Sequence, residues 1–247
     1  MSESDNAQPR HGMVIDPPTR GSYAMEKGLL LEWEAVVMEG GKNFPDLKAG
    51  FAHDFSRIDE PKTLTPVPPQ LPPIDPPADG LILSGGQKDR WACVNLTDDG
   101  IIEEIKNKGK GEAKKWPRVS VTRGAEFTVE WQYHAVHVTR GYRWFITKDG
   151  WNKTTPITRA DFEGKNYVGD KHFAPSAHDG LMWSDIFEWS PFDEHRNALQ
   201  PKKFTSATLP DDKHGHHVIL LVWIVAETDK AFYQAFDVDF DVPESEE

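Results

Sequence analysis

Two long apolar runs near the C-terminal end of the sequence constrain the fold more than any other feature. The first, His217–Val225, is nearly continuous and rich in β-branched residues, which is typical of a central strand buried on both faces. The second, Ala231–Val242, alternates apolar and polar residues with period two, as a half-buried strand does. The same alternation in Phe127–Val136, and a shorter run at Tyr142–Thr147, predict two further strands. Turn residues separate these runs, so we expect an all-β chain that folds as an antiparallel β-sandwich.

Helical signals are weaker. Apolar residues lie near a 3.6-residue period in Met25–Met38, which predicts one helical segment, and the stretch Arg159–Phe162 predicts a short helical turn. We expect these segments, together with long loops, to form an irregular loop and short-helix region at one end of the sandwich.

The organisation along the chain is that of one domain with two tails. We expect a flexible N-terminal extension at residues 1–10, a single domain at 11–241 and an acidic tail at 242–247. Eight prolines between residues 61 and 77 exclude a helix or a central strand there. This stretch is either a linker or, as we favour, a loop over the domain surface. Residues 164–203 are polar and irregular, and we interpret them as a long insertion.

Composition excludes several classes of protein. The net charge of −12 disfavours nucleic-acid binding, and no apolar run approaches the roughly 20 residues of a membrane span. Residues 1–10 contain no apolar segment typical of a secretory signal. Cys93 is the only cysteine, which excludes an internal disulfide and a thiolate metal cluster. Nine tryptophans suit either a packed core or the binding of flat ligands.

Ten histidines are the first candidates for chemistry, because the sequence contains no common zinc, nucleotide or serine-hydrolase motif. His134 and His137 are three residues apart near a strand end, so they would point to opposite faces and should not chelate one metal together. We interpret His134 as a surface histidine. His137 lies at the strand-to-loop junction, where ligands are often placed, although a structural role is the alternative. One strand cannot direct both His216 and His217 at one ion.

Six segments, in order along the chain, resemble one known family. They are His11–Arg20 (HGMVIDPPTR), Val37–Pro45 (VMEGGKNFP), Pro77–Gly85 (PADGLILSG), Ala135–Lys148 (AVHVT, then RWFITK), Gly150–Phe162 (GW, then PITRADF) and His217–Asp239. This chain therefore resembles the lytic polysaccharide monooxygenases of auxiliary-activity family 10, also called type 4 chitin-binding proteins. The resemblance implies an immunoglobulin- or fibronectin-III-like β-sandwich.

The resemblance also implies a site for one copper ion. In this family a histidine brace holds copper through the N-terminal amine and imidazole of one histidine and the imidazole of a second. Carried onto this chain, the two histidines are His11 and His137. Phe232 takes the axial position without coordinating the metal, and Ala135 shapes access to the open face of the copper. Core packing alone also explains Phe232 and Ala135.

Three further residues match family positions around the metal. Glu39 matches an acidic residue beside the ligands, and Glu227 stands where the family usually has aspartate. Trp33 falls where a flat aromatic side chain stacks on a sugar ring. The alternatives without a functional role are that Glu39 is solvated and that Trp33 is buried on a helical face.

The implied function is copper-dependent oxidative cleavage of chitin or another β-1,4-linked polysaccharide such as cellulose, by a monomer that uses an external electron donor. A non-catalytic polysaccharide-binding or adhesion protein is the alternative, and a contact with a protein partner through residues 164–203 is the third. The brace needs His11 as the N-terminal residue. Ten residues precede His11 in this sequence, which leaves three alternatives. Either a protease cuts after Arg10, or the gene start is misplaced, or copper binding is altered or lost.

The cellular location stays open. The family implies an extracellular protein. The lone Cys93 suits a reducing compartment or an export route without oxidative folding.

Overall fold

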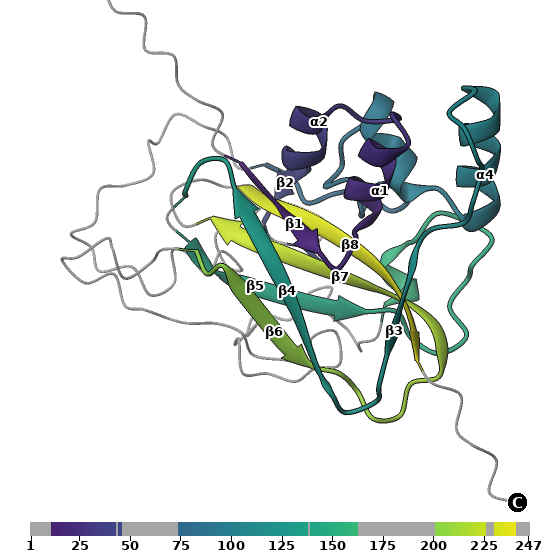
Figure 1. Ribbon diagram of the computed structural model, residues 1–247. Helices are drawn as coiled ribbons and strands as arrows, with labels where there is room; N and C mark the ends of the chain where they lie inside the picture. The colour runs from purple at the N-terminus through teal and green to yellow at the C-terminus, as the bar shows by residue number, and fades with distance from the viewer. Residues whose placement is uncertain are drawn as a thin grey trace, which may run out of the picture.

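Two β-sheets packed face to face form the centre of the molecule (Figure 1). The computed structural model describes residues 11–42, 44–45, 74–137, 139–162, 201–225 and 230–240. Aromatic and branched aliphatic side chains from both sheets fill the space between them. The predicted β-sandwich is therefore confirmed.

The smaller sheet has three antiparallel strands in the order β1–β4–β6. They are β1 (Gly12–Asp16), β4 (Glu126–Tyr133) and β6 (Phe204–Thr208). The alternation predicted for the central strand is present, because Phe127, Val129 and Trp131 are buried while the residues between them are exposed or half-buried. This strand ends at Tyr133, earlier than the predicted end at Val136.

The larger sheet has five strands, with the order β2–β8–β7–β5 and β3 paired to β8. They are β2 (Glu39–Gly41), β8 (Lys230–Phe240), β7 (Gly215–Val225), β5 (Thr139–Ile146) and β3 (Arg118–Val121). All pairs in the two sheets are antiparallel except β3–β8, which is parallel.

The larger sheet is buried on both of its faces. One face meets the smaller sheet, and a second apolar cluster covers the other face with residues from the helical segments, such as Tyr23, Val94 and Ile101. Strand β7 is buried along nearly its whole length, as predicted. The expectation that Ala231–Val242 would be half-buried is wrong, because Tyr233, Ala235 and Asp237 on the second face are covered as well.

Short helical segments supply this covering layer (Figure 1). They are α1 (Arg20–Glu26), α2 (Glu32–Val36), η2 (Asp89–Asn95), α4 (Asp98–Asn107) and η3 (Arg159–Asp161). The turn predicted at Arg159–Phe162 is confirmed. The helical segment predicted within Met25–Met38 is confirmed only over Glu32–Val36, which form α2. The first residues of the predicted range belong instead to the end of α1, which stops at Glu26, and Gly28 follows with a φ of 64°. A left-handed glycine at this position ends a helix.

A buried cluster of charges joins five of these elements. The Nε atom of Arg20 on α1 donates to Asp237 on β8 at 2.6 Å, and His216 on β7 lies 2.8 Å from the same carboxylate. Arg118 on β3 lies 3.2 Å from Asp237 and also pairs with Asp98 on α4. Because partial loss of such a cluster leaves a buried charge uncompensated, we expect it to fix the helical layer on the sheet.

Several predicted features lie outside the described residues. These are the extension at 1–10, the tail at 242–247, Glu227, residues 61–73 of the proline-rich loop and residues 164–200 of the insertion. Among the helices that the structure describes, none has the length and apolar character needed to span a bilayer. Cys93 is buried, and burial raises the pKa of its thiol to about 12, so the thiol stays protonated at neutral pH.

The cluster around Asp237 predicts a loss of stability in acid. Burial lowers the pKa of His216 in spite of its hydrogen bond to Asp237. The unfolded chain therefore binds more protons at this residue, and its contribution to stability is lost as pH falls below about 6.5. We expect a fall in the free energy of unfolding between pH 7 and pH 5 that is smaller in His216→Gln, measured by urea denaturation. The exposed His134→Gln is the control, and an equal change in both variants would contradict this role of His216.

A second loss is expected at lower pH. Burial alone raises the pKa of Asp237, but the charge of Arg20 and the hydrogen bonds from His216 and Arg20 outweigh it and hold the pKa at about 2. Its stabilising contribution is present above the unfolded pKa of about 3.9 and is lost as pH falls toward 2. Asp237→Asn should remove this lower step, which circular dichroism at a series of pH values would follow.

Candidate metal and polysaccharide site

His11 is held at the start of β1 through its backbone. Its carbonyl oxygen accepts hydrogen bonds from the N–H groups of His134 at 2.8 Å and Ala135 at 3.2 Å. These two bonds end the regular pairing of β4, which explains why the strand stops before Val136. The next residue is Gly12, where a Cβ would lie 2.7 Å from the ring of Tyr133. The glycine therefore lets the chain approach the sandwich closely at the residue beside His11.

His11 and His137 both lie against the ring of Phe232. The ring centroids are 5.8 Å apart for His11 and Phe232 and 5.7 Å apart for His137 and Phe232. The structure thus brings together two histidines that are far apart in the sequence. Phe232 is only 1% exposed, so the two imidazoles share a fixed aromatic surface.

Trp223 on β7 supports this surface from within the core. Its ring stacks on Phe232 at a centroid distance of 4.8 Å, and His137 lies 5.9 Å from it. The indole N–H donates to the hydroxyl of Thr139 at 2.8 Å, and that hydroxyl lies 3.2 Å from the carbonyl of His137. Sequence reasoning did not single out Trp223 and Thr139, although the tryptophan excess was a signal.

The electrostatic environment keeps His11 neutral and available as a ligand. Burial lowers its pKa, His137 and Lys230 lower it further, and the carboxylate of Glu39 opposes them. Its Nδ1 atom is buried and has no hydrogen-bond partner within the part of the chain that the structure describes. Buried polar atoms are rarely left in this state, and a neutral imidazole nitrogen without a partner is suited to binding a metal.

The side-chain ligands that the described residues bring together here are two imidazoles. Within the described ranges there is no group of three or more His, Cys, Asp or Glu side chains that fits a metal ion. His134 is exposed and is not part of the site, as predicted. His216 and His217 bond to separate partners, Asp237 and Thr147, in line with the expectation that they do not share an ion.

Glu39 lies at the edge of the larger sheet, opposite Phe232 in the pairing of β2 with β8. Its carboxylate forms an ion pair with Lys230 at the start of β8. Both side chains are only partly exposed, so Glu39 is neither fully solvated nor part of the core. Sequence reasoning missed Lys230, which directly precedes the predicted strand Ala231–Val242.

Two exposed apolar side chains lie on segments near the histidines: Trp33 on α2, which contacts β1, and Val136, which directly precedes His137. Trp33 on α2 is 53% exposed and meets Trp91 edge to face at 5.8 Å. Val136, beside His137, is 52% exposed, and Ala135 is half-buried. Trp33 is therefore not a core residue, and its ring is available to a flat ligand.

Comparisons with known proteins agree with this fold and identify the family of the chain. The sequence model of the family described as "Lytic polysaccharide mono-oxygenase, cellulose-degrading" matches residues 11–238. The chain belongs to this family. The GlcNAc-binding protein A of Shewanella oneidensis is 26% identical over 238 residues, which cover 93% of this chain and 35% of the relative. This chain therefore spans about a third of the length of that relative.

Two solved structures extend the likeness. A chitin-binding domain from Burkholderia pseudomallei is 30% identical, with a TM-score of 0.66 and coverage of 94% of this chain and 100% of that one. An AA10 lytic polysaccharide monooxygenase from Streptomyces lividans is 26% identical, with a TM-score of 0.56 and coverage of 93% and 100%. The predicted family is therefore confirmed.

The ion pair between Glu39 and Lys230 is expected to contribute little to stability. Lys230→Met should lower the free energy of unfolding by less than about 1 kcal/mol, because partly exposed ion pairs are screened by solvent. Phe232→Ala should lower it by about 3–5 kcal/mol, because it empties a buried aromatic position. Denaturant titration measures both values, and a loss above about 2 kcal/mol for Lys230→Met would contradict this view of the pair.

Proposed function

We propose that this protein, in a form that begins at His11, is a copper-dependent monooxygenase that cleaves chitin or another β-1,4-linked polysaccharide. The observation that carries the proposal is the pair of imidazoles on one buried phenylalanine, with the Nδ1 atom of His11 buried and without a partner in the described part of the chain.

The donor set suits copper. Imidazole is a preferred ligand of copper, and His11 and His137 would each contribute one nitrogen. A third nitrogen would come from the α-amine of His11 once residues 1–10 are removed. An α-amine has a pKa of about 7.7–8.0 and binds a metal when neutral, whereas the lone pair of a peptide nitrogen is delocalised into the amide. When bound and reduced by an external donor, copper supplies the activation of oxygen or peroxide for attack on a sugar C–H bond.

The protein side chains would prepare the surroundings of the metal. Phe232 offers no ligand atom and covers one side of the two imidazoles. Ala135, with its small side chain, leaves room on the approach to them. Glu39 is a carboxylate held nearby by Lys230, and such a group can accept or donate a proton during the reaction. Glu227 stands where the family usually has aspartate, and it would be a second acidic residue of the catalytic machinery.

Binding of a polysaccharide is supported by a separate observation. Trp33 presents a half-exposed indole. Two of the similar proteins named above are a GlcNAc-binding protein and a chitin-binding domain. Chitin is therefore the first substrate to test, and cellulose is the second because of the family description. The exposed Trp33 also favours the second candidate function, a polysaccharide-binding protein without redox activity.

Copper binding is expected to depend on both histidines. The form beginning at His11 should bind one Cu(II) ion, and His137→Ala should weaken binding by more than about 100-fold, because even residues that only orient a ligand contribute 10–100-fold. The exposed His134→Ala is the matched control. Tryptophan fluorescence quenching and electron paramagnetic resonance measure the affinity and the ligand set. Equal affinities of the two variants would contradict the proposed ligands.

Oxidative activity follows from the same site. With copper, a reductant and chitin or cellulose, the His11 form should release oxidised oligosaccharides, while the 247-residue chain should release much less. Mass spectrometry detects the products. Tight copper binding without any oxidised product from either substrate would leave only the binding function.

Trp33→Ala is expected to weaken retention on chitin about tenfold, equivalent to 1.4 kcal/mol, with little change in stability because the ring is half-exposed. The control is Phe204→Ala, which removes an equally exposed aromatic ring on the smaller sheet. A pull-down with chelator present separates this binding from copper, and equal retention of the two variants would argue against Trp33 as a sugar contact.

A further inference from the structure

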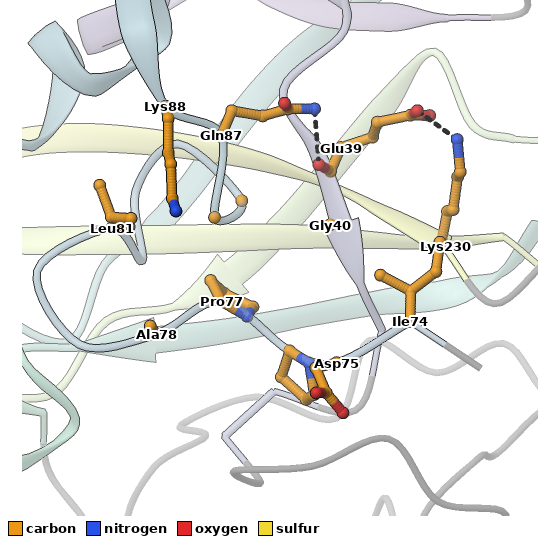
Figure 2. A pocket seen from close by; sticks show the side chains of 13 residues that line it. Glu39, Gly40, Ile74, Asp75, Pro77, Ala78, Leu81, Gln87, Lys88 and Lys230 are labelled. Atoms are coloured by element: carbon orange, nitrogen blue, oxygen red, sulfur yellow. Dashed lines mark hydrogen bonds and ion pairs between the residues drawn. The ribbon is translucent and has the colours of Figure 1, made fainter. Parts of the chain in front are cut away.

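A pocket of about 390 Å³ lies beside the Glu39–Lys230 ion pair (Figure 2). Apart from these two residues, its lining has no role in the proposed oxidation. Strand β2, the segment at residues 74–78 and the turn at residues 81–88 enclose it. Its volume falls within the range of sites that bind small ligands or single units of larger ones.

The floor of the pocket is built from backbone. Gly40 on β2 packs so closely on Gly85 that a side chain at position 40 would collide with the carbonyl of Gly85. Gly85 itself has a φ of 67°, which glycine adopts without strain. The two glycines therefore fix the spacing between β2 and the turn. The pocket that these two segments line is thus part of the fold.

The polar groups at the pocket are balanced in charge. Lys88 and Lys230 contribute two ammonium groups, and Glu39 and Asp75 contribute two carboxylates. Glu39 and Lys230 pair with each other. This balance, together with a chain net charge of −12, disfavours a strongly anionic ligand. It suits hydroxyl groups, each of which donates one hydrogen bond and accepts others.

Lys88 and Gln87 are placed to bind such groups. The ammonium of Lys88 points into the pocket and has no hydrogen bond or ion pair with any residue that the structure describes (Figure 2). The side-chain amide of Gln87 donates to the carbonyl of Glu39 at 3.1 Å, which fixes its position at the rim. Ile74, Pro77 and Leu81 supply an apolar wall. A pyranose ring has both an apolar face and a ring of hydroxyls, so it matches this lining.

We propose that this pocket is a subsite for one neutral pyranose unit, at the end of a polysaccharide chain that lies beside the proposed copper site. The inference rests on the proposed function for its choice of ligand. The pocket shares Glu39 with the copper site, and Lys88 immediately precedes η2, which carries Trp91 in contact with the exposed Trp33. A polysaccharide chain that lies across the ring of Trp33 would therefore find Lys88 close by, where it could bind a further sugar unit.

The test uses the metal-free 247-residue chain and two soluble probes, chitohexaose and cellohexaose. Titration of ¹⁵N-labelled protein should shift the backbone amides of residues 85–88 for at least one probe. Lys88→Ala should weaken binding about 3- to 10-fold, the effect of one lost hydrogen bond. Ala78→Trp, at an exposed position on the rim, should fill the pocket and abolish the shifts. The control is Lys108→Ala, which changes an exposed lysine at the C-cap of α4 and should leave binding unchanged.

Three outcomes would overturn the subsite. They are no binding of either probe, shifts confined to the region of Trp33 and Trp91, and full affinity in both Lys88→Ala and Ala78→Trp. The result is independent of oxidation. Shifts at residues 85–88 together with no oxidised product from the His11 form would retain the subsite and remove the copper enzyme.

Discussion

Burial of strand β8 on both faces is the constraint on which the rest of this molecule depends. Near one end the strand carries Phe232, the surface shared by the two histidines, and near the other it carries Asp237, the centre of the buried charge cluster. A strand with neighbours on both edges and both faces has little freedom to move. The aromatic ring against which both histidines lie is therefore held firmly in place, which favours ligands that are positioned before a metal binds.

The charge cluster is buried and its groups are paired, whereas the candidate site is partly open to solvent. At Asp237 the ions are buried and satisfy one another, so the cluster fixes the helical layer on the sheet. At the histidines the rings are only half-buried, and the Nδ1 atom of His11 has no partner in the described part of the chain. A polar atom left in this way is unfavourable for folding, and such positions are typical of sites that serve function.

The sequence alone predicted the sandwich because its strands follow simple rules. The alternation in Phe127–Tyr133 and the continuous run in His217–Val225 reflect burial directly. Helix α4 was missed because only Ile101 and Ile105 of its ten residues are buried, so the apolar period is faint. The start of this helix does have a sequence signal, because Thr97 is a typical N-cap residue and two acidic residues, Asp98 and Asp99, follow it. In the structure the Thr97 side chain accepts a hydrogen bond from the N–H of Gly100.

The convergence of His11, His137 and Phe232 was predicted from the family resemblance, because no local sequence pattern reports contacts between residues so far apart. Lys230 was missed for the same reason, since an ion pair across two strand edges leaves no periodic signal.

The way His11 is held bears on the question of its free amine. Both hydrogen bonds that tie this residue to β4 use its carbonyl oxygen, and the contact with Phe232 uses its ring. Conversion of its nitrogen from an amide to an amine changes neither the carbonyl group nor the imidazole. Removal of residues 1–10 would therefore leave these attachments in place, and it would supply the third nitrogen of the proposed copper site. The position of His11 is thus set by interactions independent of the group that processing would change, so the same fold accommodates both forms of the chain.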